Sequence, residues 1–217
     1  GLAVRQVPDA AVFTTLKNLV AAGVLVALAA ATVRPAAVRA IRPRSWASMA
    51  LIGVVGGSVP FLLFFGGLAI ASAPSAAFIH KTLFVWVAIL AVPFLGERLG
   101  LAQLAALAVL LGAQFLVIPP NGVSWGTGET LIAAATLLWA VEAILAKRLL
   151  ASVPSGVVGA GRLGIGLVVL VGYLLVAGRA SGVAALSGEQ LAWVLGTGLI
   201  LAAYVATWFA ALQRAPA

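Results

Sequence analysis

The sequence contains no cysteine, one histidine and one methionine, and only 8% of its residues are charged. Without cysteine the protein has no disulfide, no thiolate metal ligand and no cysteine redox motif. The sequence also shows no metal-ligand cluster, nucleophile motif or carboxylate pair. We therefore expect no metal site, no cofactor and no enzymatic activity.

Apolar residues are abundant instead: 64% of the chain is hydrophobic, and its mean hydropathy is +1.20. An ordinary soluble domain is about 45–50% apolar and about 25% charged. This composition argues against a soluble enzyme, a nucleic-acid-binding domain and a disordered tail, and it indicates that lipid is the solvent. The net charge of +8 then bears on orientation in a bilayer, and we expect no nucleic-acid partner.

Long apolar segments divide the chain into about seven candidate transmembrane helices, each close to the length of about 20 residues that a bilayer requires. We predict these helices at residues 11–33, 47–71, 75–95, 101–118, 128–147, 156–177 and 190–212. Turn-forming residues separate them, including Pro119–Gly122. The segments are continuously apolar, unlike the alternating strands of an outer-membrane barrel. The predicted fold is an all-α, polytopic integral membrane helix bundle.

Basic residues gather at alternate helix ends. One set of ends carries Arg34, Arg39, Arg42, Arg44, Arg98, Lys147, Arg148 and Arg214, whereas the opposite ends carry Arg5 and Arg179. By the positive-inside rule the first set is cytoplasmic. The Arg34–Arg44 loop is therefore expected in the cytoplasm, as a topology signal more than a lipid-phosphate or nucleic-acid site, and the protein in the inner (cytoplasmic) membrane.

The two halves of the chain share an internal pattern. Lys17 and Arg162 each lie about two turns inside a helix, and a proline (Pro74 and Pro216) follows at a similar distance in each half. The charge pattern places these two helices in opposite directions across the membrane. The repeat is therefore inverted, as in many secondary transporters, whose substrate sites lie at the repeat interface.

Several motifs together resemble the EamA-type members of the drug/metabolite transporter superfamily, over nearly the whole chain. They are Ala73–Ala77, Leu95–Leu99, Gln103, Gly112, Leu138–Ala140 and Lys147–Leu149. The resemblance implies ten helices arranged as five plus five. Residues 1–120 then form a first repeat with helices two to five, and residues 121–217 form an incomplete second repeat with helices six to eight. Phe84 stands where the family often has proline, so a kink is expected elsewhere.

Charged residues inside the helices are candidate functional residues, because a Lys or Arg at mid-helix costs about 2.5–3.5 kcal/mol. Lys17 and Lys81 belong to the outer half of the membrane, where snorkelling to the interface is the alternative. Glu142 and Arg162 lie in the other half on helices joined by a short turn, and we predict an ion pair between them. A static structural pair is as well supported as a coupling or substrate site.

Aromatic residues and the histidine complete the candidate site. Trp86, Trp139, Tyr204 and Trp208 are candidates to line a cavity, with membrane-interface anchoring or packing as the alternative. His80 is expected to be a buried, hydrogen-bonded histidine, with proton relay as the alternative. Glycines such as Gly53 and Gly57 are expected to let helices approach closely. Asp9, Glu129 and Glu189 lie near helix ends and are expected to be solvated.

These observations favour a secondary transporter that moves a small metabolite (amino acid-like, drug-like or another small organic solute) by alternating access. The alternative is a non-transporting helical membrane subunit or scaffold. The residues expected to bind substrate are Lys17, His80, Lys81, Trp86, Trp139, Glu142, Arg162 and Tyr204. Membrane lipid is an expected partner, while coupling to protons or another ion and formation of a homodimer stay open.

Overall fold

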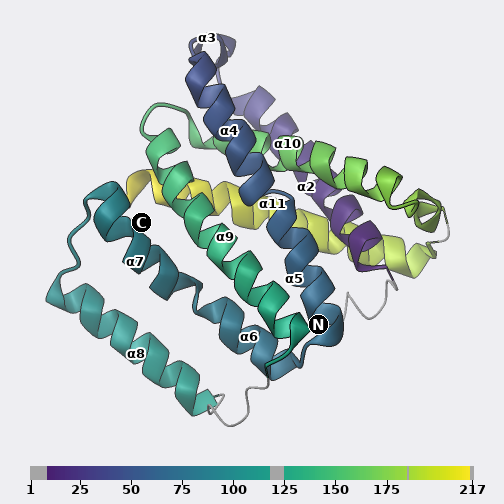
Figure 1. The fold of residues 1–217 in the computed structure, drawn as a ribbon. Helices are drawn as coiled ribbons and strands as arrows, with labels where there is room; N and C mark the ends of the chain where they lie inside the picture. The colour runs from purple at the N-terminus through teal and green to yellow at the C-terminus, as the bar shows by residue number, and fades with distance from the viewer. Residues whose placement is uncertain (1–8, 118–124, 185, 216–217) are drawn as a thin grey trace.

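A computed structural model describes residues 9–117, 125–184 and 186–215. These residues form helices and no strand (Figure 1). The elements are α2 (Ala10–Thr32), α3 (Pro35–Arg39), α4 (Pro43–Val55), α5 (Val59–Ile70), α6 (Ala73–Lys81), α7 (Leu83–Leu95), α8 (Leu101–Val117), α9 (Thr127–Leu150), α10 (Ser155–Val176), the 3-10 helix η2 (Ala180–Val183) and α11 (Gly188–Arg214). Arg5, the Pro119–Gly122 turn and Pro216 lie outside the described residues.

Six stretches of these helices are long and apolar enough to cross a membrane, and α8 is a shorter apolar helix. The six are α2, α4 with α5, α6 with α7, α9, α10 and α11. Every predicted apolar segment is thus found as helix, and the prediction of an all-α polytopic membrane bundle is confirmed.

Side chains near the helix ends satisfy backbone groups that the helices leave free. Asp9 Oδ1 accepts hydrogen bonds from the backbone N–H of Ala11 at 2.8 Å and Val12 at 3.2 Å at the start of α2. Ser187 and Gln190 form a capping box at the start of α11. These local signals set where the long helices begin.

Two of the predicted helices are interrupted, which corrects the expectation of unbroken helices over residues 47–71 and 75–95. The first breaks between α4 and α5, where Pro60 occupies the first turn of α5 and has no N–H to donate to the Gly56 carbonyl. The second breaks at Thr82, whose N–H donates to the Ile79 carbonyl at 3.1 Å, in the tighter 3-10 pattern. Pro93 lies inside the last turn of α7.

The helices pack into one bundle (Figure 1). α2 packs along α10 and α11, α5 packs along α9, and α4 crosses α10. The last crossing is very close, because a Cβ added at Gly53 of α4 would lie 2.8 Å from Ile165 Cβ of α10. The approach continues just after α4, where a Cβ added at Gly166 would lie 2.5 Å from the Gly57 carbonyl oxygen. The predicted role of Gly57 in close helix packing is confirmed. The division into repeats at residue 120 stays a prediction.

The C-terminal end of α9 binds two other helices through their C-terminal carbonyl groups. Lys147 Nζ donates to the carbonyl oxygens of Leu212, at 2.7 Å, and Ala215 beside α11. Arg148 donates through Nε to the Phe94 carbonyl of α7 at 3.1 Å. Both cations, interpreted from the sequence as topology signals, therefore also join helices.

In contrast, α8 lies at the edge of the molecule (Figure 1). Gln114 Nε2 donates to the Phe78 carbonyl of α6 at 2.7 Å, and the Phe78 and Phe115 rings are 5.5 Å apart. Most of its other side chains are exposed, and Leu116 is 88% exposed. The attachment of α8 thus depends on few contacts.

Candidate functional site

A cavity of about 750 Å³ lies among the membrane-spanning helices. It is lined by residues from α2, α5, α6, α7, α8, α9, α10 and α11. The predicted site residues in its wall are Lys17, His80, Lys81, Trp139, Glu142, Arg162 and Tyr204, together with Trp208. The structure therefore brings these residues around one space, although they come from distant parts of the sequence.

Trp86 is the predicted site residue that does not line this cavity. Its side chain is 39% exposed, and its Nε1 donates to Thr82 Oγ1 at 3.1 Å, one turn back along the chain. This placement corresponds to the alternative of packing at the membrane-facing surface.

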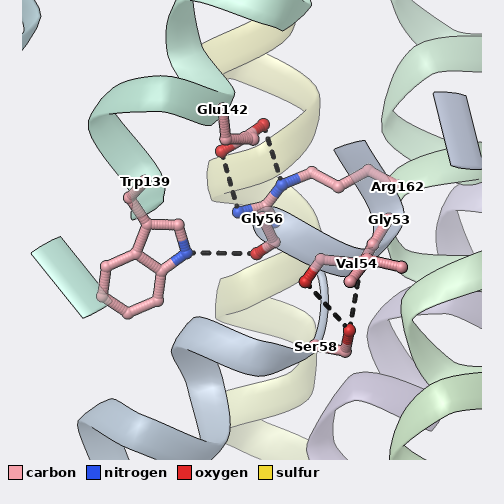
Figure 2. A network of polar contacts seen from close by, with 7 residues as sticks. All are labelled: Gly53, Val54, Gly56, Ser58, Trp139, Glu142 and Arg162. Atoms are coloured by element: carbon pink, nitrogen blue, oxygen red, sulfur yellow. Dashed lines mark hydrogen bonds and ion pairs between the residues drawn. The ribbon is translucent and has the colours of Figure 1, made fainter. Parts of the chain in front are cut away.

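Glu142 of α9 and Arg162 of α10 form the predicted ion pair (Figure 2). Arg162 Nε lies 3.1 Å from Glu142 Oε1, and Arg162 Nη2 lies 3.3 Å from Glu142 Oε2. Both side chains are buried, so each charge is partnered where water is scarce. The ion pair forms as predicted, but α9 and α10 do not pack along each other, because α5 lies along α9 and α2 lies along α10.

The break between α4 and α5 lies against this ion pair (Figure 2). A Cβ added at Gly56 would lie 2.2 Å from Glu142 Cγ. The Gly56 carbonyl, which Pro60 cannot bond, accepts instead from Trp139 Nε1 at 3.1 Å. Ser58 Oγ donates within the break, at 3.1 Å to the carbonyl oxygens of Gly53 and of Val54. Irregular backbone here has polar partners, as the low-dielectric interior requires.

Lys17 of α2 is 4% exposed and points at aromatic rings of α5. Its Nζ lies 4.2 Å from the centroid of the Phe61 ring and 4.7 Å from that of Phe65. Arg162 Cζ also lies 5.6 Å from the Phe61 centroid, so two cations flank one ring. Within the described part of the chain, no carboxylate lies within 4.0 Å of the Lys17 ammonium.

His80 and Lys81 line the cavity from the C-terminal end of α6. The His80 ring centroid is 4.9 Å from that of Phe64 and 5.2 Å from that of Trp139. Its Nδ1 is buried and has no hydrogen-bond partner, which corrects the expectation of a hydrogen-bonded histidine at that atom. Lys81 is exposed, so it does not share the burial of Lys17.

Three phenylalanines in the wall are absent from the sequence-based site. Phe61, Phe64 and Phe65 stand at positions i, i+3 and i+4 of α5, so they share one helix face. Phe61 and Trp139 have ring centroids 5.4 Å apart, and so do Phe64 and Trp139. The spacing of these residues in the sequence could have indicated their role, because it places the three rings on one face of α5.

Among the three acidic residues near helix ends, Glu189 is exposed and Asp9 is partly exposed, whereas Glu129 differs from the expectation. Glu129 is 5% exposed and accepts a hydrogen bond from the Ser72 N–H at 3.2 Å, so the prediction of a solvated side chain is wrong. It is buried because α9 begins against the corner between α5 and α6, where a free backbone donor needs an acceptor. Asp9 caps α2 and pairs with Arg179 at 3.4 Å.

Comparison with known proteins gives two findings. The sequence profile of the EamA-like transporter family matches residues 3–118, more than half of the chain. A solved structure described as "Crystal structure of protein" has a TM-score of 0.75 and 17% sequence identity, covering 98% of this chain and 74% of that chain. This likeness shows a shared fold. No curated protein matches the sequence.

Proposed function

This chain belongs to the EamA-like transporter family, and from that premise we propose that it is a secondary transporter for a small organic solute. The proposed route runs through the cavity in the bundle, and the mechanism is alternating access across the cytoplasmic membrane. The Arg34–Arg44 loop is proposed to face the cytoplasm.

The main observation behind this proposal is the set of charges buried at the cavity. Lys17, Glu142 and Arg162 are each at most 6% exposed and all line it. Ionisable residues inside a membrane bundle are costly and commonly mark a substrate or ion pathway. A purely static ion pair needs no open space beside it, whereas a binding site does.

Both helix interruptions also lie at this cavity. The cavity wall includes Trp139 and Glu142, which contact the break between α4 and α5. It also includes His80 and Lys81, which come just before the break at Thr82. In secondary transporters, interrupted helices supply backbone groups and dipole ends to substrate and coupling ions. We propose that the Glu142–Arg162 pair is the element that changes partners during the cycle, with a proton or another ion as its coupling partner.

Site-directed labelling tests the proposal sharply, because the natural chain has no cysteine to interfere. Ala88→Cys places one thiol in the cavity wall, and Ala27→Cys places one on an exposed position of α2 as the matched control. In sealed vesicles, a membrane-impermeant maleimide should label the Ala88→Cys variant from either side of the membrane. A transported solute should raise the labelling rate from one side and lower the labelling rate from the other.

The Ala27→Cys variant should show no such solute-dependent exchange of sidedness. Labelling of the Ala88→Cys variant from one side under every condition, with no uptake from a panel of acidic, basic and neutral solutes, would favour the non-transporting subunit and overturn the proposal.

A further inference from the structure

From the cavity's charge and lining we infer that its solute is an organic acid with a flat apolar body, whose carboxylate binds Lys17. This inference rests on the proposed function and narrows it to one substrate class. It also separates Lys17 from Lys81, which the sequence treats alike.

The first argument is the balance of charge in the wall. Lys17, Lys81 and Arg162 line the cavity, and among the described residues Glu142 is the acid that faces them there. Both Glu142 carboxylate oxygens are bound by Arg162. The pair is neutral in sum, which leaves Lys17 and Lys81 as excess positive charges, and of these two Lys17 is the one buried in a site of low dielectric. Such a site favours an anion over a neutral or cationic solute.

The second argument is the surroundings of the Lys17 ammonium. Its observed contacts are the faces of Phe61 and Phe65, and a cation–π contact contributes about 0.5–2 kcal/mol. Burial of a lysine at mid-helix costs about 2.5–3.5 kcal/mol, so the rings offset only part of that cost. An ammonium also carries three N–H donors that the ring faces do not saturate. A carboxylate on the solute supplies both the charge and the acceptors.

The third argument is the shape and polarity of the remaining wall. The rings of Phe64, Trp139 and His80 contact one another, with centroids 4.9–5.4 Å apart, and they present aromatic surface on which a planar body can stack. An amino acid would also need a counter-charge for its own ammonium. Among the described residues of the wall Glu142 is the carboxylate, and it is already engaged by Arg162, so the wall suits an acid without an amino group.

Binding measurements on the full chain in lipid nanodiscs test this inference. Trp139 and Trp208 line the cavity, so their fluorescence reports occupancy. We expect benzoate to bind about tenfold more tightly than benzamide, its neutral isostere, and more tightly than phenylalanine. Lys17→Gln should remove the preference for benzoate and leave benzamide binding unchanged, whereas Lys17→Arg should keep the preference. Arg44→Gln, at an exposed position of α4, is the matched control and should behave as the natural chain.

Equal affinity of the natural chain for benzoate and benzamide overturns the inference, and so does a preference that persists in Lys17→Gln. Complete displacement of benzoate by chloride at an equal concentration also overturns it, because the site is then selective for charge alone. The two proposals fail separately. Lys17-dependent benzoate binding without two-sided labelling of Ala88→Cys removes the transport proposal, and two-sided labelling without a benzoate preference removes this one.

Discussion

The two interrupted spans differ in how they break, although in both a side chain from another helix donates a hydrogen bond to a backbone carbonyl at the break. Trp139 of α9 bonds Gly56 in the first break, and Gln114 of α8 bonds Phe78 in the second. Only the first break has a covalent cause, because Pro60 lacks the N–H that would bond Gly56.

The surroundings of the two breaks differ as well. The first is enclosed by α9 and α10 and lies against the Glu142–Arg162 pair. The second depends on α8, which lies at the edge of the molecule. The first break is encoded by proline, whereas the second contains no proline, and the Thr82 hydroxyl donates to the Ile79 carbonyl within it at 2.7 Å. The comparison teaches that the first break follows from covalent structure, whereas the second is held by hydrogen bonds, one of which comes from α8.

The largest effect is expected from removing a charge beside the first break. Arg162→Met leaves the Glu142 carboxylate buried without its partner, so the free energy of unfolding should fall by about 3–5 kcal/mol. Chemical unfolding of the purified protein in detergent measures the loss. The double variant Glu142→Leu/Arg162→Met removes both charges and should recover most of the stability. A double variant as unstable as the single one contradicts the electrostatic explanation.

A smaller loss is expected from filling the space at the first break. Gly56→Ala places a methyl group against the Glu142 side chain, and overpacking of this kind costs about 1–3 kcal/mol. Gly66→Ala, on α5 where nothing lies within 4 Å, is the matched control and should be neutral or slightly stabilising. Thermal unfolding of the two variants side by side measures the difference. Equal melting temperatures for both would show that Glu142 moves aside freely.

The smallest effects compare the two replacement donors directly. Trp139→Phe and Gln114→Leu each remove one hydrogen bond to a carbonyl, and such bonds in membrane proteins contribute about 0.6 kcal/mol on average. The two variants should nevertheless loosen different parts of the protein. Gln114→Leu should speed hydrogen exchange in α8, whereas Trp139→Phe should leave α8 unchanged. Faster exchange of α8 in both variants would mean that the two breaks are coupled.

The sequence predicts the spans and the Glu142–Arg162 pair well, because both follow from local quantities: the length of an apolar run and the shortness of a turn. The first break was also readable, since glycines precede Pro60 within a few residues. The break at Thr82 was not, because no proline marks it and the side chain that bonds its Phe78 carbonyl, Gln114, is distant in the sequence. Burial of Glu129 has the same origin, since it depends on where α9 meets the corner before α6.

Lys147 and Arg148 carry a consequence for how this protein is assembled. The cations that the positive-inside rule predicts to orient the chain also bind carbonyl groups near the C-terminal ends of α11 and α7. The same two residues therefore bear on both the orientation of the chain and the packing of its helices. Replacing Lys147 and Arg148 by acidic residues to invert the topology would also remove the hydrogen bonds that hold α11 and α7. Such a variant would therefore change orientation and folding at the same time.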